Sequence, residues 1–168
     1  FRFNSINVKS LVFKKTDFNI NKEDLIFFER LLKTEPNENE IIIKNSNIFF
    51  NDNNGEVLFI NKIYNSKFYY DSKNLQNIFL SKNEIFKVPY KFIIKYDRFN
   101  KKLFTNFTSK KIRLTIKNVI DYDKDIKTGL ADILLINKNT SLKYELKKEL
   151  LSFVSENNNN SYNGEIYF

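Results

Sequence analysis

The chain has 168 residues, of which 42% are hydrophobic and 29% are charged, so its composition is that of one globular domain. It contains neither His nor Cys. These absences exclude Zn sites of the usual nitrogen and sulfur type, Cys or Ser–His–Asp nucleophile systems and thiol redox chemistry. We therefore expect no enzyme activity, no metal site and no cofactor.

Strict alternation of apolar and polar residues predicts β-strands, because neighbouring side chains in a strand point to opposite faces. In residues 111–117, Ile112, Leu114 and Ile116 share one face while Lys, Arg and Thr occupy the other. The same pattern occurs in 90–97 and 142–148. Further β-rich runs lie at 4–13, 40–50, 56–63, 67–70, 75–81, 103–108, 130–136, 150–155 and 162–168.

Short polar segments separate these runs and predict turns, since Asn and Asp tolerate the left-handed backbone conformation. They lie at 51–56, 71–74, 97–102, 121–129, 137–140 and 156–161. Short connections favour antiparallel neighbours. We therefore predict a mostly β fold, an antiparallel meander that curls into an open groove or an elongated sheet. The start at Phe1 and the unterminated alternation at the end predict that residues 1–168 are a single β segment excerpted from a longer chain.

One segment has helical periodicity. Residues 22–33 follow a capping Asn21, carry acidic residues in the first turn and precede Pro36. Their apolar stripe consists of Leu25, Phe28, Leu31 and Leu32. The sequence therefore predicts one short amphipathic helix that covers a sheet face.

The net charge of +8 and the isoelectric point of about 9.4 raise the question of an anionic partner. Only four of the 28 basic residues are Arg, the residue on which base and phosphate recognition mainly depends. We therefore expect no nucleic acid as a partner and interpret the lysines as a solvated strand face.

The residues Asp121, Asp123 and Asp125 have the alternate spacing of a calcium loop. Ile126 stands where such a loop needs Gly, and Asp132 stands where it needs a Glu. The segment is therefore interpreted as a turn.

The order of strand patterns resembles the AsmA-like family of bacterial envelope proteins. The resemblance spans roughly residues 5–122 and is carried by the pattern Ile43, Ser46, Ile48, Phe50 and Asp52, by a following strand with Ile60 and Ile63, and by a strand that begins at Pro89. The family resemblance implies a periplasmic β-groove protein for phospholipid transport and outer-membrane maintenance, anchored in the inner membrane by an upstream segment. It implies a phospholipid or another acyl-chain ligand as partner.

The candidate lipid-binding groove combines the apolar faces of the three alternating strands. Its residues are Phe92, Ile94, Tyr96, Ile112, Leu114, Ile116, Leu142, Tyr144 and Leu146. Alternation does not distinguish an open groove from a closed core beneath the helix. The alternative functions are a structural or adhesive extracellular β domain and, third, a basic nucleic-acid-binding module.

Overall fold

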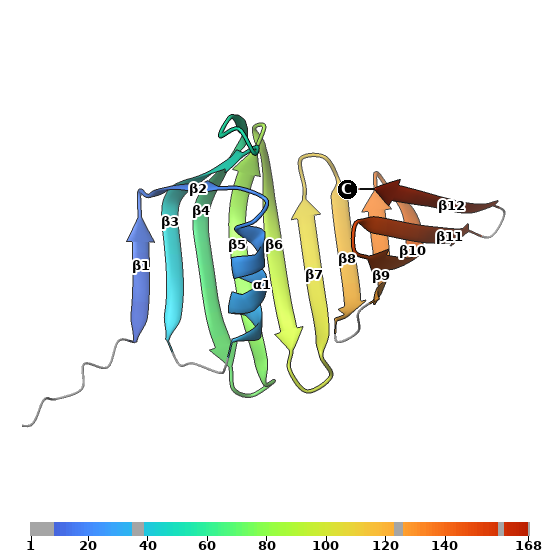
Figure 1. The fold of residues 1–168 in the computed structure, drawn as a ribbon, viewed down its shortest axis with the longest axis horizontal. Helices are drawn as coiled ribbons and strands as arrows, with labels where there is room; N and C mark the ends of the chain where they lie inside the picture. The colour runs from blue at the N-terminus through green and yellow to red at the C-terminus, as the bar shows by residue number, and fades with distance from the viewer. Residues whose placement is uncertain (1–8, 35–38, 123–125, 158–159, 168) are drawn as a thin grey trace, which may run out of the picture.

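The computed structural model describes residues 9–34, 39–122, 126–157 and 160–167. It confirms the predicted fold class: one open sheet contains all the strands, with one helix in front of it (Figure 1). The elements are β1 (Ser10–Lys14), β2 (Asp17–Ile20), α1 (Leu25–Lys33), β3 (Glu40–Asn51), β4 (Val57–Asp71), β5 (Gln76–Ile85), β6 (Val88–Asp97), β7 (Lys102–Ser109), β8 (Leu114–Asp121), β9 (Lys127–Leu135), β10 (Lys138–Lys147), β11 (Leu150–Asn157) and β12 (Asn160–Tyr167). From β3 to β12 each strand pairs antiparallel with the next one in the chain.

The N-terminal strands depart from the antiparallel expectation. Both β1 and β2 pair with β3 in parallel. A parallel return needs a crossover, and α1 provides it between β2 and β3. The β2–α1–β3 unit therefore places the helix over one face of the sheet, which we call the helix face.

The helix begins three residues later than predicted, at Leu25 instead of residue 22. Residues 22–24 instead form a turn, in which Asn21 Oδ1 accepts hydrogen bonds from the Glu23 and Asp24 amides at 2.8 and 3.1 Å. Among the described residues, no helix is long and apolar enough to span a bilayer.

The C-terminal end of α1 is tied to the sheet. Asn77 of β5 donates from Nδ2 to the carbonyl oxygens of Leu32 at 2.8 Å and Thr34 at 3.1 Å, and Arg98 also donates to Thr34. These side chains satisfy carbonyl groups that a helix end leaves without intrahelical partners. They hold the helix across β5, as Figure 1 shows.

Several predicted boundaries shift. The runs at 56–63 and 67–70 form the single strand β4, whose pairing with β5 is irregular between Ile63 and Asn65. The turn predicted at 137–140 consists of Ile136 and Asn137, and the residues after it already belong to β10. Residues 110–113 form a turn, so β8 begins only at Leu114. The alternation of 111–117 therefore extends beyond the strand itself.

Burial is concentrated on the helix face of β3, β4 and β5. Every buried residue of the described chain except Ile78 lies on the helix face. Seven of them belong to these three strands: Ser46, Ile63, Ser66, Phe68, Asn77, Ser81 and Asn83. Some of their polar side chains hydrogen-bond to each other, as Ser81 Oγ does to Asn83 Oδ1 at 2.6 Å. The compact core thus occupies only one part of a wide sheet.

The β5–β6 turn provides a test of local strain. Its two residues, Phe86 and Lys87, have φ of 50° and 62°, a combination that favours Asn and Gly in a two-residue hairpin. We predict that Phe86→Asn with Lys87→Gly raises the free energy of unfolding by about 1–2 kcal/mol, measured by urea titration. Phe99→Asn, in a turn where φ of Phe99 is not positive, is the control and should give no such gain. A loss of stability in the double variant would contradict the turn geometry.

Candidate ligand-binding face

Eight of the nine predicted groove residues lie on the helix face. The cross-strand register aligns Phe92 with Phe107, Phe107 with Ile116, and Ile116 with Ile133, which fixes the facing of β6 and β8. Asn77, whose side chain reaches the helix, is paired with Tyr96, and the same row continues through Ile120 and Gly129 to Tyr144. The eight are Phe92, Ile94, Tyr96, Leu114, Ile116, Leu142, Tyr144 and Leu146.

Ile112 is the exception, and the prediction that it lines the groove is wrong. It lies in the turn between β7 and β8 and is 40% exposed. The β7–β8 pairing ends at Ser109 and Leu114, and Arg113 has a φ of 51°. The chain reverses direction there, so the side chain of Ile112 is not part of a strand face.

The structure adds apolar residues that the sequence argument did not select. They come from the strands between and beyond the three alternating ones: Leu103, Phe107, Ala131, Ile133, Leu151 and Phe153. Their strands also carry Thr105, Gly129 and Ser155 on the same face, which interrupts the apolar alternation. The facing of these residues therefore follows only from their pairing with the alternating strands, which the sequence pattern alone does not reveal.

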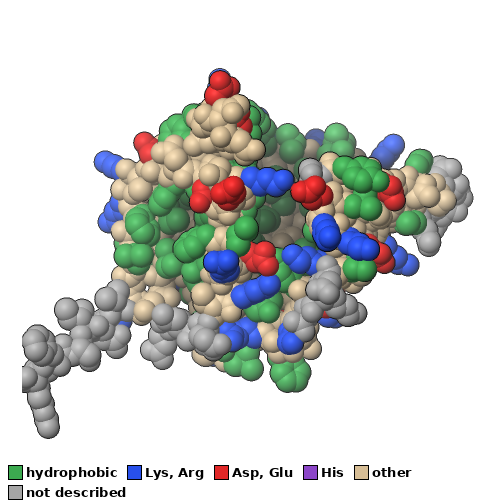
Figure 2. Space-filling model, in the orientation of Figure 1, with side chains coloured by type: hydrophobic (Ala, Val, Ile, Leu, Met, Phe, Trp, Pro, Cys, Tyr) green, Lys and Arg blue, Asp and Glu red, His purple; other side chains and the backbone are tan. Residues whose placement is uncertain are grey.

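This face remains open beyond β5. The eight predicted residues are all half-buried, and none is buried. The helix buries none of its own residues, and Leu25, Ile26 and Phe27 are 47%, 54% and 63% exposed. Figure 2 shows hydrophobic side chains in a hollow on this side of the molecule, with both basic and acidic side chains around it. No second layer covers the face among the described residues.

A depression of about 340 Å³ lies on the helix face of the last strands. Its lining is apolar apart from the hydroxyl of Tyr144, and it comprises Ala131, Leu142, Tyr144, Leu151, Phe153 and Ile166. Two predicted groove residues, Leu142 and Tyr144, thus meet three others that come from β11 and β12. Such a surface suits hydrocarbon rather than a polar ligand.

Two glycines allow aromatic rings to lie flat on this face. Gly129 pairs with Tyr144 and Gly164 pairs with Phe153. A Cβ atom at Gly129 would overlap the Tyr144 ring, and one at Gly164 would lie 2.6 Å from Phe153 Cζ. The Tyr144 hydroxyl donates to Asn118 Oδ1 at 2.7 Å, and burial raises the pKa of this tyrosine. The tyrosine is therefore a neutral, fixed part of the apolar surface.

One edge of the hollow is bounded by a contact between α1 and the end of β8. Lys33 forms an ion pair with Glu29 at 2.9 Å and lies 4.2 Å from the ring centroid of Tyr122. Lys127 lies 4.4 Å from the same ring. Burial and the nearby Glu29 carboxylate raise the pKa of Tyr122. Burial also raises the pKa of Glu29, but hydrogen bonds from Lys33 and Tyr122 lower it below its ordinary value.

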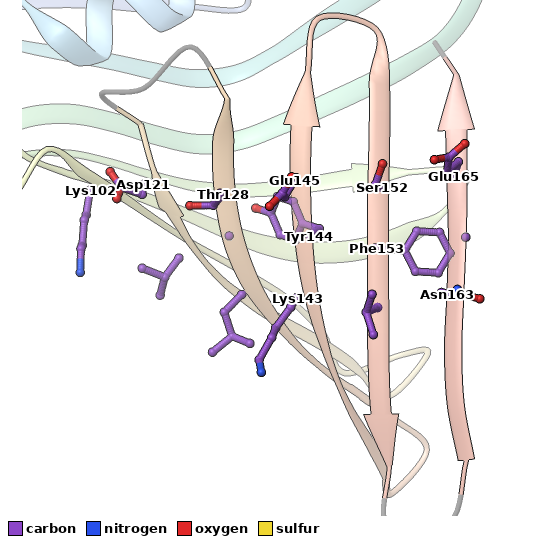
Figure 3. A pocket seen from close by; sticks show the side chains of 15 residues that line it. Lys102, Asp121, Thr128, Lys143, Tyr144, Glu145, Ser152, Phe153, Asn163 and Glu165 are labelled. Carbon is purple, nitrogen blue, oxygen red and sulfur yellow. The ribbon is translucent and has the colours of Figure 1, made fainter.

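The opposite side of the sheet, the outer face, carries a shallow cavity of about 910 Å³ (Figure 3). One row of its lining crosses β7 to β12 in register and alternates charged and hydroxyl side chains: Lys102, Asp121, Thr128, Glu145, Ser152 and Glu165. A parallel row includes Val119, Leu130 and Val154. The cavity is therefore amphipathic and open.

The carboxylates of this row are spread out rather than clustered. Asp121, Glu145 and Glu165 are each separated by one intervening strand, which places their backbones roughly 10 Å apart. Among the described residues, no group of three or more acidic side chains is arranged to hold a metal ion. Asp123 and Asp125 lie outside the described residues.

The contact between Gly129 and the Tyr144 ring predicts that substitutions at these two residues are coupled in their effect on stability. We predict that Gly129→Ala lowers the free energy of unfolding by about 1–3 kcal/mol, because the new methyl group displaces the Tyr144 ring. In a Tyr144→Leu background the same substitution should cost clearly less, and a double-mutant cycle measures the difference. An equal cost in both backgrounds would contradict the contact.

Comparisons with family models, with curated proteins and with solved structures found no match to this chain. The AsmA-like resemblance therefore remains a prediction from strand and turn patterns.

Proposed function

We propose that the helix face of β6 to β12 binds the acyl chain of a lipid, without catalysis. The observation that supports it most directly is the set of half-buried apolar side chains on strands that no other layer covers among the described residues, of which Phe92, Phe107, Ile116 and Ile133 form a continuous cross-strand row. A large uncovered apolar face is typical of a ligand or partner site. The depression lined by Ala131, Leu142, Tyr144, Leu151, Phe153 and Ile166 is an apolar part of this surface with room for hydrocarbon.

The size of the helix supports an open face. Its nine residues are about 13 Å long, and a helix with side chains is about 10 Å wide. The seven strands from β6 to β12 span roughly 30 Å at the usual strand spacing. The helix is held over β5 by Asn77, so it cannot also cover the last strands.

The energetics favour a ligand with two chains. Each methylene removed from water contributes about 0.8 kcal/mol, so a chain of about sixteen carbons with half its surface against the sheet gains roughly 6 kcal/mol. Association itself costs about 4–15 kcal/mol. A single fatty acid on this face therefore binds weakly, whereas a phospholipid, with twice the hydrocarbon, binds measurably.

The resemblance to the AsmA-like family supplies the biological context of this proposal. In that form, the chain is one stretch of a longer periplasmic groove that carries phospholipid for outer-membrane maintenance and is held at the inner membrane by an upstream anchor. The wide meander and the uncovered apolar face support this assignment. A structural or adhesive β domain is the main alternative, in which the same face packs against another protein layer.

Two adjacent residues of β9 provide a matched test. Ile133 is half-buried on the helix face, whereas Leu134 is 43% exposed on the outer face. We predict that delipidated wild-type protein takes up phospholipid, measured by native mass spectrometry and fluorescent-lipid transfer. Ile133→Asp should abolish uptake because it places a charge in the apolar row, and Leu134→Asp should retain it.

A second variant separates lost binding from lost folding. Ala131→Leu fills the apolar depression without adding charge, and it should reduce uptake while far-UV circular dichroism stays that of the wild type. Absence of phospholipid uptake by the wild-type protein would contradict the proposed function. Equal losses in Ile133→Asp and Leu134→Asp would also contradict it.

A further inference from the structure

Three turns at the same end of the strands form a continuous surface. They are the β5–β6 turn with Phe86 and Lys87, the β7–β8 turn at 110–113, and the β9–β10 turn with Ile136 and Asn137. Lys111 Nζ donates to the Lys87 carbonyl at 2.8 Å, and the Ile136 amide donates to the Arg113 carbonyl at 3.1 Å. These bonds join the three turns into one structural unit, which we call the basic edge.

The basic edge carries positive charge and exposed apolar side chains together. Its cations are Lys87, Lys110, Lys111 and Arg113, Lys138 follows directly at the start of β10, and these turn segments contain no Asp or Glu. Phe86, Ile136 and Ile112 are 75%, 59% and 40% exposed. An acidic residue, Glu84, lies two residues before Phe86 on β5, where its carboxylate accepts a hydrogen bond from the Tyr64 hydroxyl at 2.8 Å.

A lysine-lined depression of about 530 Å³ adjoins the basic edge on the outer face. Lys82, Lys91, Lys110 and Lys111 line it without a carboxylate, but most of its exposed lining is apolar and includes Tyr64, Pro89 and Ile93. Lys82 and Lys91 are direct cross-strand partners, an arrangement of like charges that destabilises a sheet. Neither they nor Lys110 forms an ion pair with a described residue. A bound anion would relieve this repulsion.

The opposite edge of the sheet provides a contrast. Its β4–β5 and β6–β7 turns begin with Asp71 and Asp97, whose carboxylates accept hydrogen bonds from turn amides. Hydrogen bonds from Asn74 and Asn100 lower the pKa of Asp71 and Asp97, so both are charged at neutral pH. Phe99 is 85% exposed there, between Arg98 and Asn100, in a turn that combines Asp97 with the basic residues Arg98 and Lys101.

We propose that the basic edge docks on an anionic phospholipid bilayer, with lipid phosphates at the ammonium groups of the lysines around this depression and Phe86 and Ile112 among the headgroups. Lysines around exposed apolar side chains are the usual composition of such a surface. Asn is abundant in this chain, yet Phe86 occupies a turn position that favours Asn. The Phe86 ring lies 6.5 Å from the Phe59 ring between centroids, yet the residue remains 75% exposed. This docking goes beyond the proposed acyl-chain site and does not depend on it.

Vesicle flotation tests whether the lysines bind anionic lipid. Wild-type protein should float with phosphatidylcholine vesicles that contain phosphatidylglycerol, and not with phosphatidylcholine alone. The triple variant Lys82→Gln, Lys91→Gln, Lys110→Gln should lose on the order of 100-fold in partitioning. The control variant Lys73→Gln, Lys147→Gln, Lys148→Gln removes the same charge from exposed sites elsewhere and should retain binding. Because like-charge repulsion is removed, the first variant should be at least as stable as the wild type in urea.

A fluorescence experiment tests the orientation. The chain contains no Trp, so Phe86→Trp and Phe99→Trp each introduce a sole reporter in an exposed turn. Emission from the first should shift to the blue when anionic vesicles are added, and emission from the second should not. Equal shifts, no shift at Phe86→Trp, or tighter binding to single-stranded nucleic acid through the same lysines would overturn the proposal. Vesicle docking without acyl-chain uptake would leave it standing while refuting the proposed function.

Discussion

The removal of an apolar sheet face from water is the constraint on which this structure depends. A sheet needs a second layer, its own curvature or a ligand to shield such a face. Here the only helix among the described residues crosses β5 and is fastened there by Asn77 and Arg98. Seven side chains on the helix face of β3, β4 and β5 are buried, whereas on the later strands only Ser109, Ala131 and Ser155 are buried among the described residues. The folding core therefore ends, and the candidate site begins, where the helix no longer covers the sheet.

The two faces of the sheet present different chemistry at the same strands. On the helix face, Tyr144 and Phe153 lie over glycines and form a flat apolar surface. On the outer face, the row from Lys102 to Glu165 alternates charge and hydroxyl groups. Because side chains alternate along each strand, a substitution at one position alters only one of the two faces. This separation allows an apolar ligand on one face and an anionic surface near one edge.

Alternation predicted the facing of Phe92, Ile116 and Tyr144 because it is a local property of a strand. It failed at Ile112, where an alternating sequence continues into a turn with Arg113 in a left-handed conformation. The parallel pairing of β1 and β2 with β3 depends on the crossover through α1, which no local pattern reveals. Ile133 and Phe153 were missed for a similar reason, since only their pairing partners place them on the face. The basic edge arises from turns far apart in the sequence that strand order brings together.

Quenching by phospholipid with brominated acyl chains tests the central claim that the helix face of the late strands accepts hydrocarbon. Phe153→Trp and Val154→Trp place a sole reporter on neighbouring residues of β11 that point to opposite faces. The proposed acyl-chain site predicts strong quenching of the first reporter and little quenching of the second at the same lipid concentration. Equal quenching of both, or no quenching at Phe153→Trp in a folded protein, would contradict it.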